Sequence, residues 1–178
     1  MSGPSPFSIP LVGVELRPET QRKVIPDVRV HQQRGRHLCW AAVGASVAKH
    51  LGYQNLATEE AVAKAVLGGA VTDIDQPQEL APALKAAKFG GKPSGFLKPR
   101  RVETRIWQQA RPIAISLELH GYGTHAVLIT GTTLGGTYAY VEDPIDQTRA
   151  WLPTAKLGAS YRSGARWSSS FVFKYGIR

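Results

Sequence analysis

The order of the expected elements indicates an α+β domain, with helices in the first part of the 178-residue chain and an antiparallel sheet after them. Apolar residues between positions 38 and 88 recur at the three- and four-residue spacing of helices. Between positions 113 and 175, short runs of β-branched and aromatic residues are separated by Gly, Asp or Pro, as in strands joined by turns. A chain of this length most simply forms one domain around one core.

Residues 1–30 are expected to form an extended N-terminal arm, followed by a folded domain over residues 31–178. Proline recurs along this arm, and it lacks the backbone N–H that a helix interior requires. The prolines are Pro4, Pro6, Pro10, Pro18 and Pro26. Two stretches of the arm, Leu11–Leu16 and Val28–Val30, have the apolar character of short strands.

Four helices are expected after the arm. They cover Leu38–Leu51, the segment from Thr58 to the Gly68-Gly69 pair, Pro77–Lys88 and Val102–Gln109. Gly52 is the stop signal of the first helix, and Thr58 is a suitable N-cap for the second because its hydroxyl can accept a backbone N–H. Pro82 offers an alternative first turn for the third helix, because proline is tolerated there.

Five strands are expected in the rest of the chain. They cover Ile113–Leu119, His125–Thr130, Thr137–Val141, Thr148–Trp151 and Ser170–Tyr175. Short turns between successive strands favour antiparallel pairing. The layout predicts a cleft with helices on one side and strands on the other.

Four residues carry the candidate chemistry of this cleft. Cys39, the only cysteine, lies at the start of the first expected helix, where unpaired N–H groups favour the nucleophilic thiolate. Gln33 lies six residues earlier, His125 opens a strand, and Asp143 follows the next strand. They supply a nucleophile, an oxyanion donor, a general base and a carboxylate that orients the base. Each residue type is more often structural, so the hypothesis depends on their combination and order.

The sequence also offers alternatives to these assignments. His120 is an alternative base, and Glu142 and Asp146 are alternative carboxylates. A zinc site is conceivable from His31, His37, Cys39 and His50. Structural zinc sites usually pair cysteines, and this chain has no second one, so neither a metal nor a cofactor is expected.

Three segments resemble bacterial papain-like cysteine peptidases. These are Gln32–Ala42, Thr124–Gly131 and Val141–Pro144, within a similar region from Arg29 to Trp151. The similar types are effector proteases of plant-pathogenic bacteria and the double-glycine leader peptidases of bacteriocin exporters. The resemblance implies a papain-like fold, with N-terminal helices packed on a C-terminal antiparallel sheet. It implies the same roles for the four candidate residues, although papain itself has asparagine in place of Asp143.

The resemblance also implies an activity. It is that of a cysteine endopeptidase, which cleaves a protein through a thioester acyl-enzyme and prefers small residues such as Gly-Gly before the cleaved bond. A stand-alone bacterial effector or toxin is the expected role, because no transporter segments accompany the domain. The alternative is a non-catalytic module of the same fold that binds a peptide in the cleft.

The formal net charge of +9 bears on partners. The chain has no acidic residue after Asp146 but six basic ones, Arg149, Lys156, Arg162, Arg166, Lys174 and Arg178. A second basic group consists of Lys98, Arg100, Arg101 and Arg105. Such surfaces can attract an acidic protein, for example an inhibitor or immunity protein. The chain has no recognised nucleic-acid motif, so nucleic acid is not favoured.

The compartment is inferred from what the sequence lacks. No apolar stretch has the length of a membrane span, and residues 1–6 do not have the charge and apolar pattern of a secretory signal. We therefore expect production in the cytoplasm and delivery to another cell by a specialised secretion system.

Overall fold

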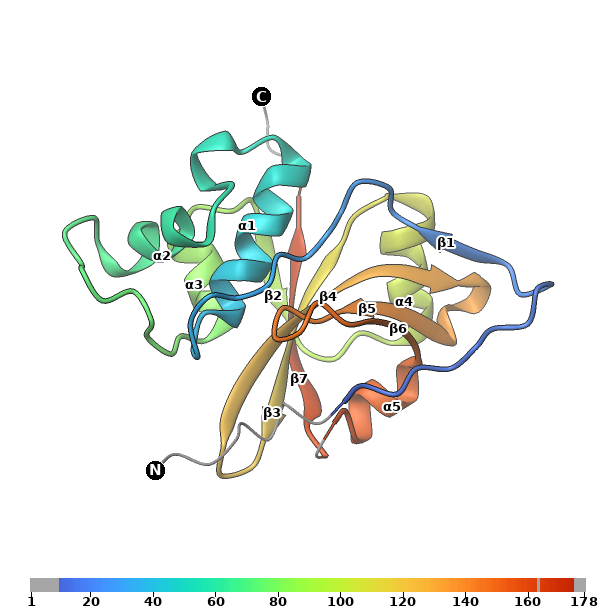
Figure 1. Ribbon diagram of the computed structural model, residues 1–178. Coiled ribbons are helices and arrows are strands. Elements are labelled where there is room, and N and C mark those ends of the chain that lie inside the picture. The colour runs from blue at the N-terminus through green and yellow to red at the C-terminus, as the bar shows by residue number, and fades with distance from the viewer. Residues whose placement is uncertain (1–9, 163, 175–178) are drawn as a thin grey trace.

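An antiparallel sheet of seven strands forms the frame of the computed structural model, which describes residues 10–162 and 164–174. The strands are β1 Arg22–Val24, β2 Gly91–Ser94, β3 Ile113–Leu119, β4 Gly123–Thr133, β5 Tyr138–Glu142, β6 Arg149–Pro153 and β7 Arg166–Phe173. Their order is β2-β7-β3-β4-β5-β6, and β1 pairs with the end of β4 (Figure 1). The class is therefore α+β.

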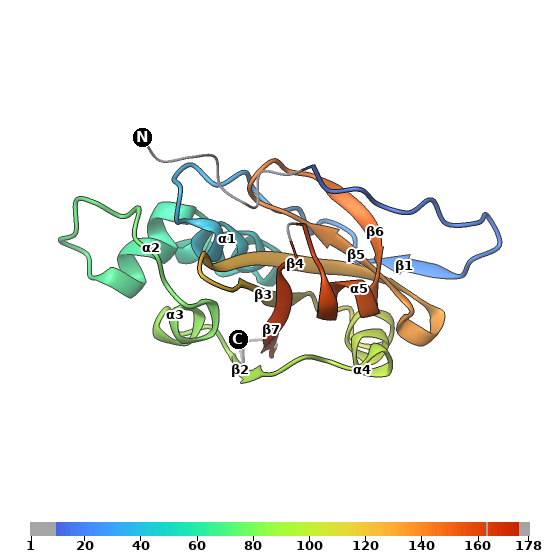
Figure 2. The same ribbon diagram turned by 90° about the horizontal axis from the view of Figure 1, so that it is seen from below.

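The helices lie at two ends of this sheet. They are α1 Cys39–Leu51, α2 Glu59–Leu67, α3 Leu80–Ala86, α4 Pro99–Glu103 and α5 Thr154–Ala159, with the short turns η2 Gln54–Leu56, η3 Thr104–Gln108 and η4 Leu134–Gly136. Figures 1 and 2 show α1, α2 and α3 together at one end and α4 and α5 at the other. The sheet also draws on the N-terminal half, because β1 precedes all the helices and β2 follows α3.

Local signals placed the first two helices well. The first begins at Cys39, and Gly52 ends it in the left-handed conformation with φ 81°, which glycine adopts without a Cβ clash. The Thr58 side chain accepts a hydrogen bond from Ala61 N and caps α2. The predicted start of the third helix at Pro77 is wrong. The helix begins at Leu80, so Pro82 occupies the first turn, where its missing N–H breaks no helical hydrogen bond.

Strand prediction succeeded in the second half and failed in the first. β3 has the predicted bounds, and β4 to β7 overlap their predicted segments, although Tyr175 lies outside the described residues. Neither Leu11–Leu16 nor Val28–Val30 forms a strand. Residues 22–24 of the predicted arm pair with β4 instead, so the sheet begins before residue 31; residues 1–9 of the arm lie outside the described part.

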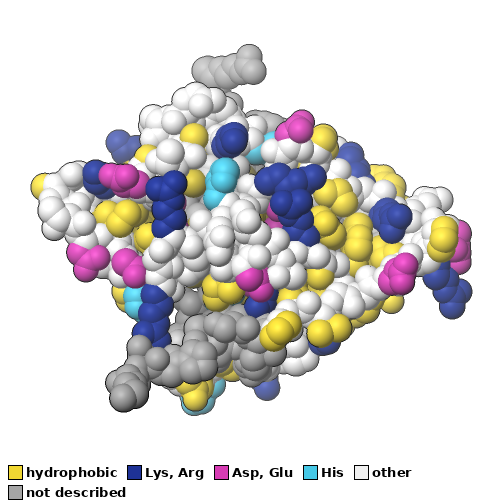
Figure 3. Space-filling model, in the orientation of Figure 1, with side chains coloured by type: hydrophobic (Ala, Val, Ile, Leu, Met, Phe, Trp, Pro, Cys, Tyr) yellow, Lys and Arg dark blue, Asp and Glu magenta, His cyan; other side chains and the backbone are white. Residues whose placement is uncertain are grey.

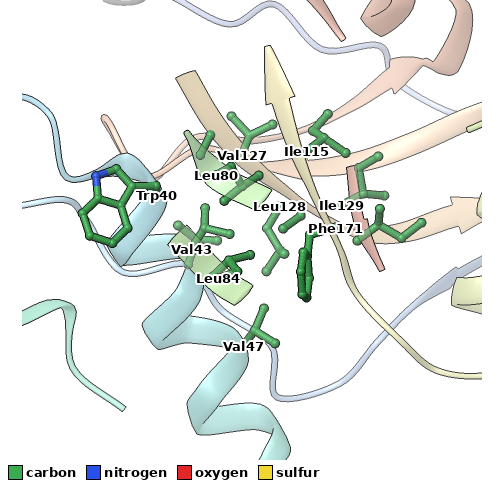
Figure 4. Close-up of a cluster of buried hydrophobic side chains, with 14 of the residues drawn as sticks. Trp40, Val43, Val47, Leu80, Leu84, Ile115, Val127, Leu128, Ile129 and Phe171 are labelled. Atoms are coloured by element: carbon green, nitrogen blue, oxygen red, sulfur yellow. The ribbon is translucent and has the colours of Figure 1, made fainter. Parts of the chain in front are cut away.

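A shared core fixes the helices against the sheet. Figure 4 shows side chains of α1 and α3 meeting side chains of β3, β4 and β7: Trp40, Val43, Val47, Leu80, Leu84, Ile115, Val127, Leu128, Ile129 and Phe171. All ten have exposed fractions of 2% or less. Full burial of one such side chain contributes roughly 1.5–3 kcal/mol. The core therefore sets the position of the first turn of α1 relative to β4, the two elements that carry Cys39 and His125.

Candidate active site

His125 and Asp143 are in contact in the interior. His125 lies on β4, Asp143 follows β5, and these strands are neighbours in the sheet. The pairing places His125 Nε2 2.8 Å from Asp143 Oδ1. Only 2% of His125 and none of Asp143 is exposed. Of the three candidate carboxylates, Asp143, Glu142 and Asp146, Asp143 is the one hydrogen-bonded to His125.

Cys39 lies on the other side of the same histidine. Cys39 and His125 both line a cavity of about 490 Å³, and a hydrogen bond joins their side chains. The imidazole therefore contacts Asp143 through Nε2 and also contacts the Cys39 thiol. The helical side of the cavity is formed by 36–37, Cys39 and 77–79, and the strand side by 122–125 and Ile145. The structure thus brings together three of the four predicted residues.

The surroundings of His125 favour its charged form. Burial lowers the pKa of the imidazole, but the charge and hydrogen bond of Asp143, followed by the contact with Cys39, outweigh burial and raise the pKa to about 10. The pKa of Asp143 is lowered: burial opposes its ionisation, and the effects of His125, Arg162 and the Ile145 N–H exceed that cost. At neutral pH the pair is therefore an imidazolium and a carboxylate.

Because of this pair, the folded protein should lose stability as the pH becomes alkaline. The folded-state pKa of His125 is raised from 6.5 to about 10, so its contribution is fully present below about pH 6.5 and is lost as the pH rises through about 10. We expect the free energy of unfolding to fall across that range by at most about 1.4 kcal/mol per pH unit from this one proton. The measurement is urea unfolding of a Cys39→Ala protein at a series of pH values.

The matched control is the Cys39→Ala/His125→Gln double variant. Both proteins lack the thiol, so the difference between their pH dependences belongs to the imidazole. Parallel curves for the two proteins would contradict the assigned charge state of His125.

Asp143 has two further partners that the sequence analysis did not identify. Its Oδ2 accepts a hydrogen bond from Tyr161 Oη at 2.7 Å and forms an ion pair with Arg162 Nη2 at 3.1 Å. Arg162 was assigned to a basic surface, and this was wrong, because its side chain is fully buried. Nothing in the sequence separates Arg162 from the exposed Arg149, Lys156, Arg166 and Lys174.

The alternative residues have other surroundings. The Glu142 carboxylate is buried and accepts hydrogen bonds from Thr130 Oγ1 and Val30 N, at 2.9 and 3.0 Å. Asp146 contacts Arg162, and His120 lines a separate cavity with Glu118. Within residues 10–162 and 164–174, no three His, Cys, Asp or Glu side chains converge as metal ligands.

Gln33 lies beside this centre but does not line the cavity. Its backbone N–H donates to Pro144 O at 2.8 Å, which ties it to the residue after Asp143. Its Nε2 donates to the carbonyls of Gly35 and Arg36, at 2.7 and 3.2 Å. Donation to an oxyanion therefore requires the amide to release at least one of these carbonyls, and the predicted role of Gln33 stays a prediction.

Two acids hold the loop between Gln33 and Cys39. Asp75 accepts the backbone N–H groups of Arg36 and His37, at 2.9 and 2.7 Å. Glu59 accepts the N–H of Arg34 at 3.2 Å. The loop then enters α1, where the Cys39 N–H belongs to the first turn and has no acceptor within the helix. This N–H is available to an oxygen bound next to the thiol.

On the face that Figure 3 shows, charge is not gathered in one field. Figure 3 shows Lys and Arg side chains in separate groups on one face, with Asp and Glu between them. Arg29 and Arg149 lie at the surface over the buried Glu142, each 3.6 Å from its carboxylate. No helix in the described part of the chain is long and apolar enough to cross a membrane.

Comparison with known proteins assigns the chain to a family. No curated protein matches the chain. A family model described as the papain-like cysteine protease AvrRpt2 matches residues 22–157, a range that begins at β1 and includes Cys39, His125 and Asp143. Because the match covers most of the 178 residues, the chain belongs to the AvrRpt2 family of papain-like cysteine proteases, enzymes whose substrates are proteins.

Proposed function

We propose that this protein is an endopeptidase in which Cys39 is the nucleophile, His125 the acid and base, and Asp143 the residue that orients His125. The observation that carries the proposal is the buried 2.8 Å contact between His125 and Asp143, together with the cavity that His125 and Cys39 both line. The raised pKa of His125 supports it, because an imidazolium stabilises a neighbouring thiolate.

The reaction follows from these placements. The Cys39 sulfur attacks the peptide carbonyl carbon, a C–S bond forms, and the oxygen becomes an oxyanion that accepts from the Cys39 N–H and the Gln33 amide. The C–N bond then breaks as His125 gives its proton to the leaving amine, which leaves a thioester. His125 next takes a proton from water, the hydroxide attacks the thioester, and the C–S bond breaks to restore the thiolate.

Replacing Gln33 with alanine tests the oxyanion role. Loss of one such donor lowers kcat by about 10²–10³-fold, and we expect a loss of this size with little change in KM. The measurement is steady-state kinetics together with urea unfolding, because the Gln33 amide also binds the carbonyls of Gly35 and Arg36. A fall in stability with an unchanged kcat would show that the amide only organises this loop.

We infer the biological role and the substrate preference from the family. The role is that of a stand-alone effector or toxin, made in the cytoplasm and delivered to another cell by a specialised secretion system. Small residues, in particular Gly-Gly, are the proposed preference before the cleaved bond, by analogy with the double-glycine leader peptidases that the chain resembles. The net charge of +9 supports an acidic inhibitor or immunity protein as a further partner.

A comparison of cleavage products tests the activity and the preference together. A native protein extract is incubated with the wild-type protein or with Cys39→Ala, and newly formed N-termini are identified by mass spectrometry. We expect new termini only with the wild type, and small residues just before them. An absence of new termini, with peptides retained equally by both proteins, would instead support a peptide-binding module.

A further inference from the structure

The Asp143 carboxylate is bound on both of its oxygens. Oδ1 accepts from His125 Nε2 at 2.8 Å and from the backbone N–H of Ile145 at 2.9 Å. Oδ2 accepts from Tyr161 Oη at 2.7 Å and forms an ion pair with Arg162 Nη2 at 3.1 Å. Four groups from three parts of the chain therefore meet one carboxylate. Rotation of the carboxylate away from His125 would break the bonds of both oxygens.

The two donors to Oδ2 are themselves fixed. Arg162 Nη2 also contacts the Asp146 carboxylate, at 3.1 Å from Oδ1 and 3.0 Å from Oδ2, so this nitrogen bridges two acids. Tyr161 exchanges two backbone hydrogen bonds with Ala165, and only 1% of the residue is exposed. If either side chain moved into solvent, the buried Asp143 carboxylate would lose one of its partners.

We propose that Tyr161 and Arg162 are positioning residues of the peptidase reaction, which hold the Asp143 carboxylate so that Oδ1 stays aligned with His125 Nε2. This inference rests on the proposed function of Cys39, His125 and Asp143. Neither residue lines the cavity that contains Cys39 and His125, so both act through Asp143. Their contribution should therefore appear in kcat rather than in KM.

Tyr161 and Arg162 contact Asp143 differently, the first by a hydrogen bond and the second by an ion pair. Tyr161 contributes a neutral donor, and its loss frees Oδ2 on one side without changing the charge. Arg162 contributes a positive charge and a second anchor at Asp146, so Arg162→Met leaves two acids without their shared partner. Arg162→Lys keeps the positive charge but loses the planar guanidinium. We therefore expect its kcat to lie between those of the wild type and Arg162→Met.

The test compares Tyr161→Phe, Arg162→Lys and Arg162→Met with a matched control, Thr154→Val. Thr154 is also fully buried and donates one side-chain hydrogen bond, to Gly136 O at 2.6 Å, but it does not contact Asp143. We expect Tyr161→Phe to lower kcat by about 10- to 100-fold, because small misplacements of a catalytic group have effects of this size. KM should change little, and Thr154→Val should keep the wild-type kcat after correction for the folded fraction.

A second readout does not depend on turnover. The proton between His125 Nε2 and Asp143 Oδ1 belongs to a charge-assisted hydrogen bond and is expected as a far-downfield NMR signal. We expect it to weaken or shift in Tyr161→Phe and to persist in Thr154→Val. An unchanged signal and kcat in Tyr161→Phe would overturn the proposal. Inactive wild-type protein with a signal that responds to Tyr161→Phe would contradict the peptidase function but uphold the positioning. If Arg162→Met does not fold, the kcat values and NMR signals of Tyr161→Phe and Arg162→Lys test the positioning role instead.

Discussion

Replacing Cys39 with alanine is expected to abolish peptide cleavage. In the proposed mechanism the Cys39 sulfur forms the covalent bond with the substrate, and no second nucleophile in the described cavity is paired with His125. The substitution removes only one sulfur from a residue that is 8% exposed, so the fold should persist. The measurements are cleavage of a protein substrate and thermal unfolding of both proteins.

Alkylation provides a direct control, because Cys39 is the only cysteine and all labelling reports on it. A thiolate held by an imidazolium should react with iodoacetamide at mildly acidic pH much faster than free cysteine does, and His125→Gln should remove this advantage. Cys39→Ala should not be labelled. Cleavage of the same bonds by Cys39→Ala would show that another group is the nucleophile.

Elements with local signals were predictable from the sequence. The stop at Gly52, the cap at Thr58 and the apolar run of β3 depend on neighbouring residues, and the structure confirms all three. β1 and β2 lack such signals because they form by pairing with β4 and β7, far away in the sequence. Pro93 argues against a strand, yet it is accommodated because β2 is the edge strand.

Some residues of the candidate site could be predicted from the sequence and others could not. Cys39, His125 and Asp143 stand next to recognisable helix and strand boundaries, so their proximity could be inferred before the structure. Tyr161 and Arg162 follow α5, a helix that was not predicted, and their contact with Asp143 depends on how that helix returns to the sheet. No spacing or motif encodes such a contact.

Replacing Asp143 with asparagine should cost both stability and turnover, although the two side chains have nearly the same shape. Asparagine has one acceptor oxygen, so its NH₂ must face either the donors to Oδ1 or the donors to Oδ2. At the Oδ2 position the Tyr161 hydroxyl can turn and accept, but the Arg162 guanidinium has no acceptor to offer. Breaking a buried ion pair in this way costs about 3–5 kcal/mol of unfolding free energy.

Turnover should fall because the charge of Asp143 is the strongest influence that raises the pKa of His125 against burial. Without it, the imidazolium that protonates the leaving amine is less populated, and we expect kcat/KM to drop by about 10²–10⁴-fold. Asp146→Asn is the matched control, because Asp146 contacts Arg162 but has no contact with His125, and 36% of its side chain is exposed. Urea unfolding and steady-state kinetics should separate the two variants. Equal effects of both substitutions would mean that Asp143 serves only as a counter-ion of Arg162, and that another group orients the histidine.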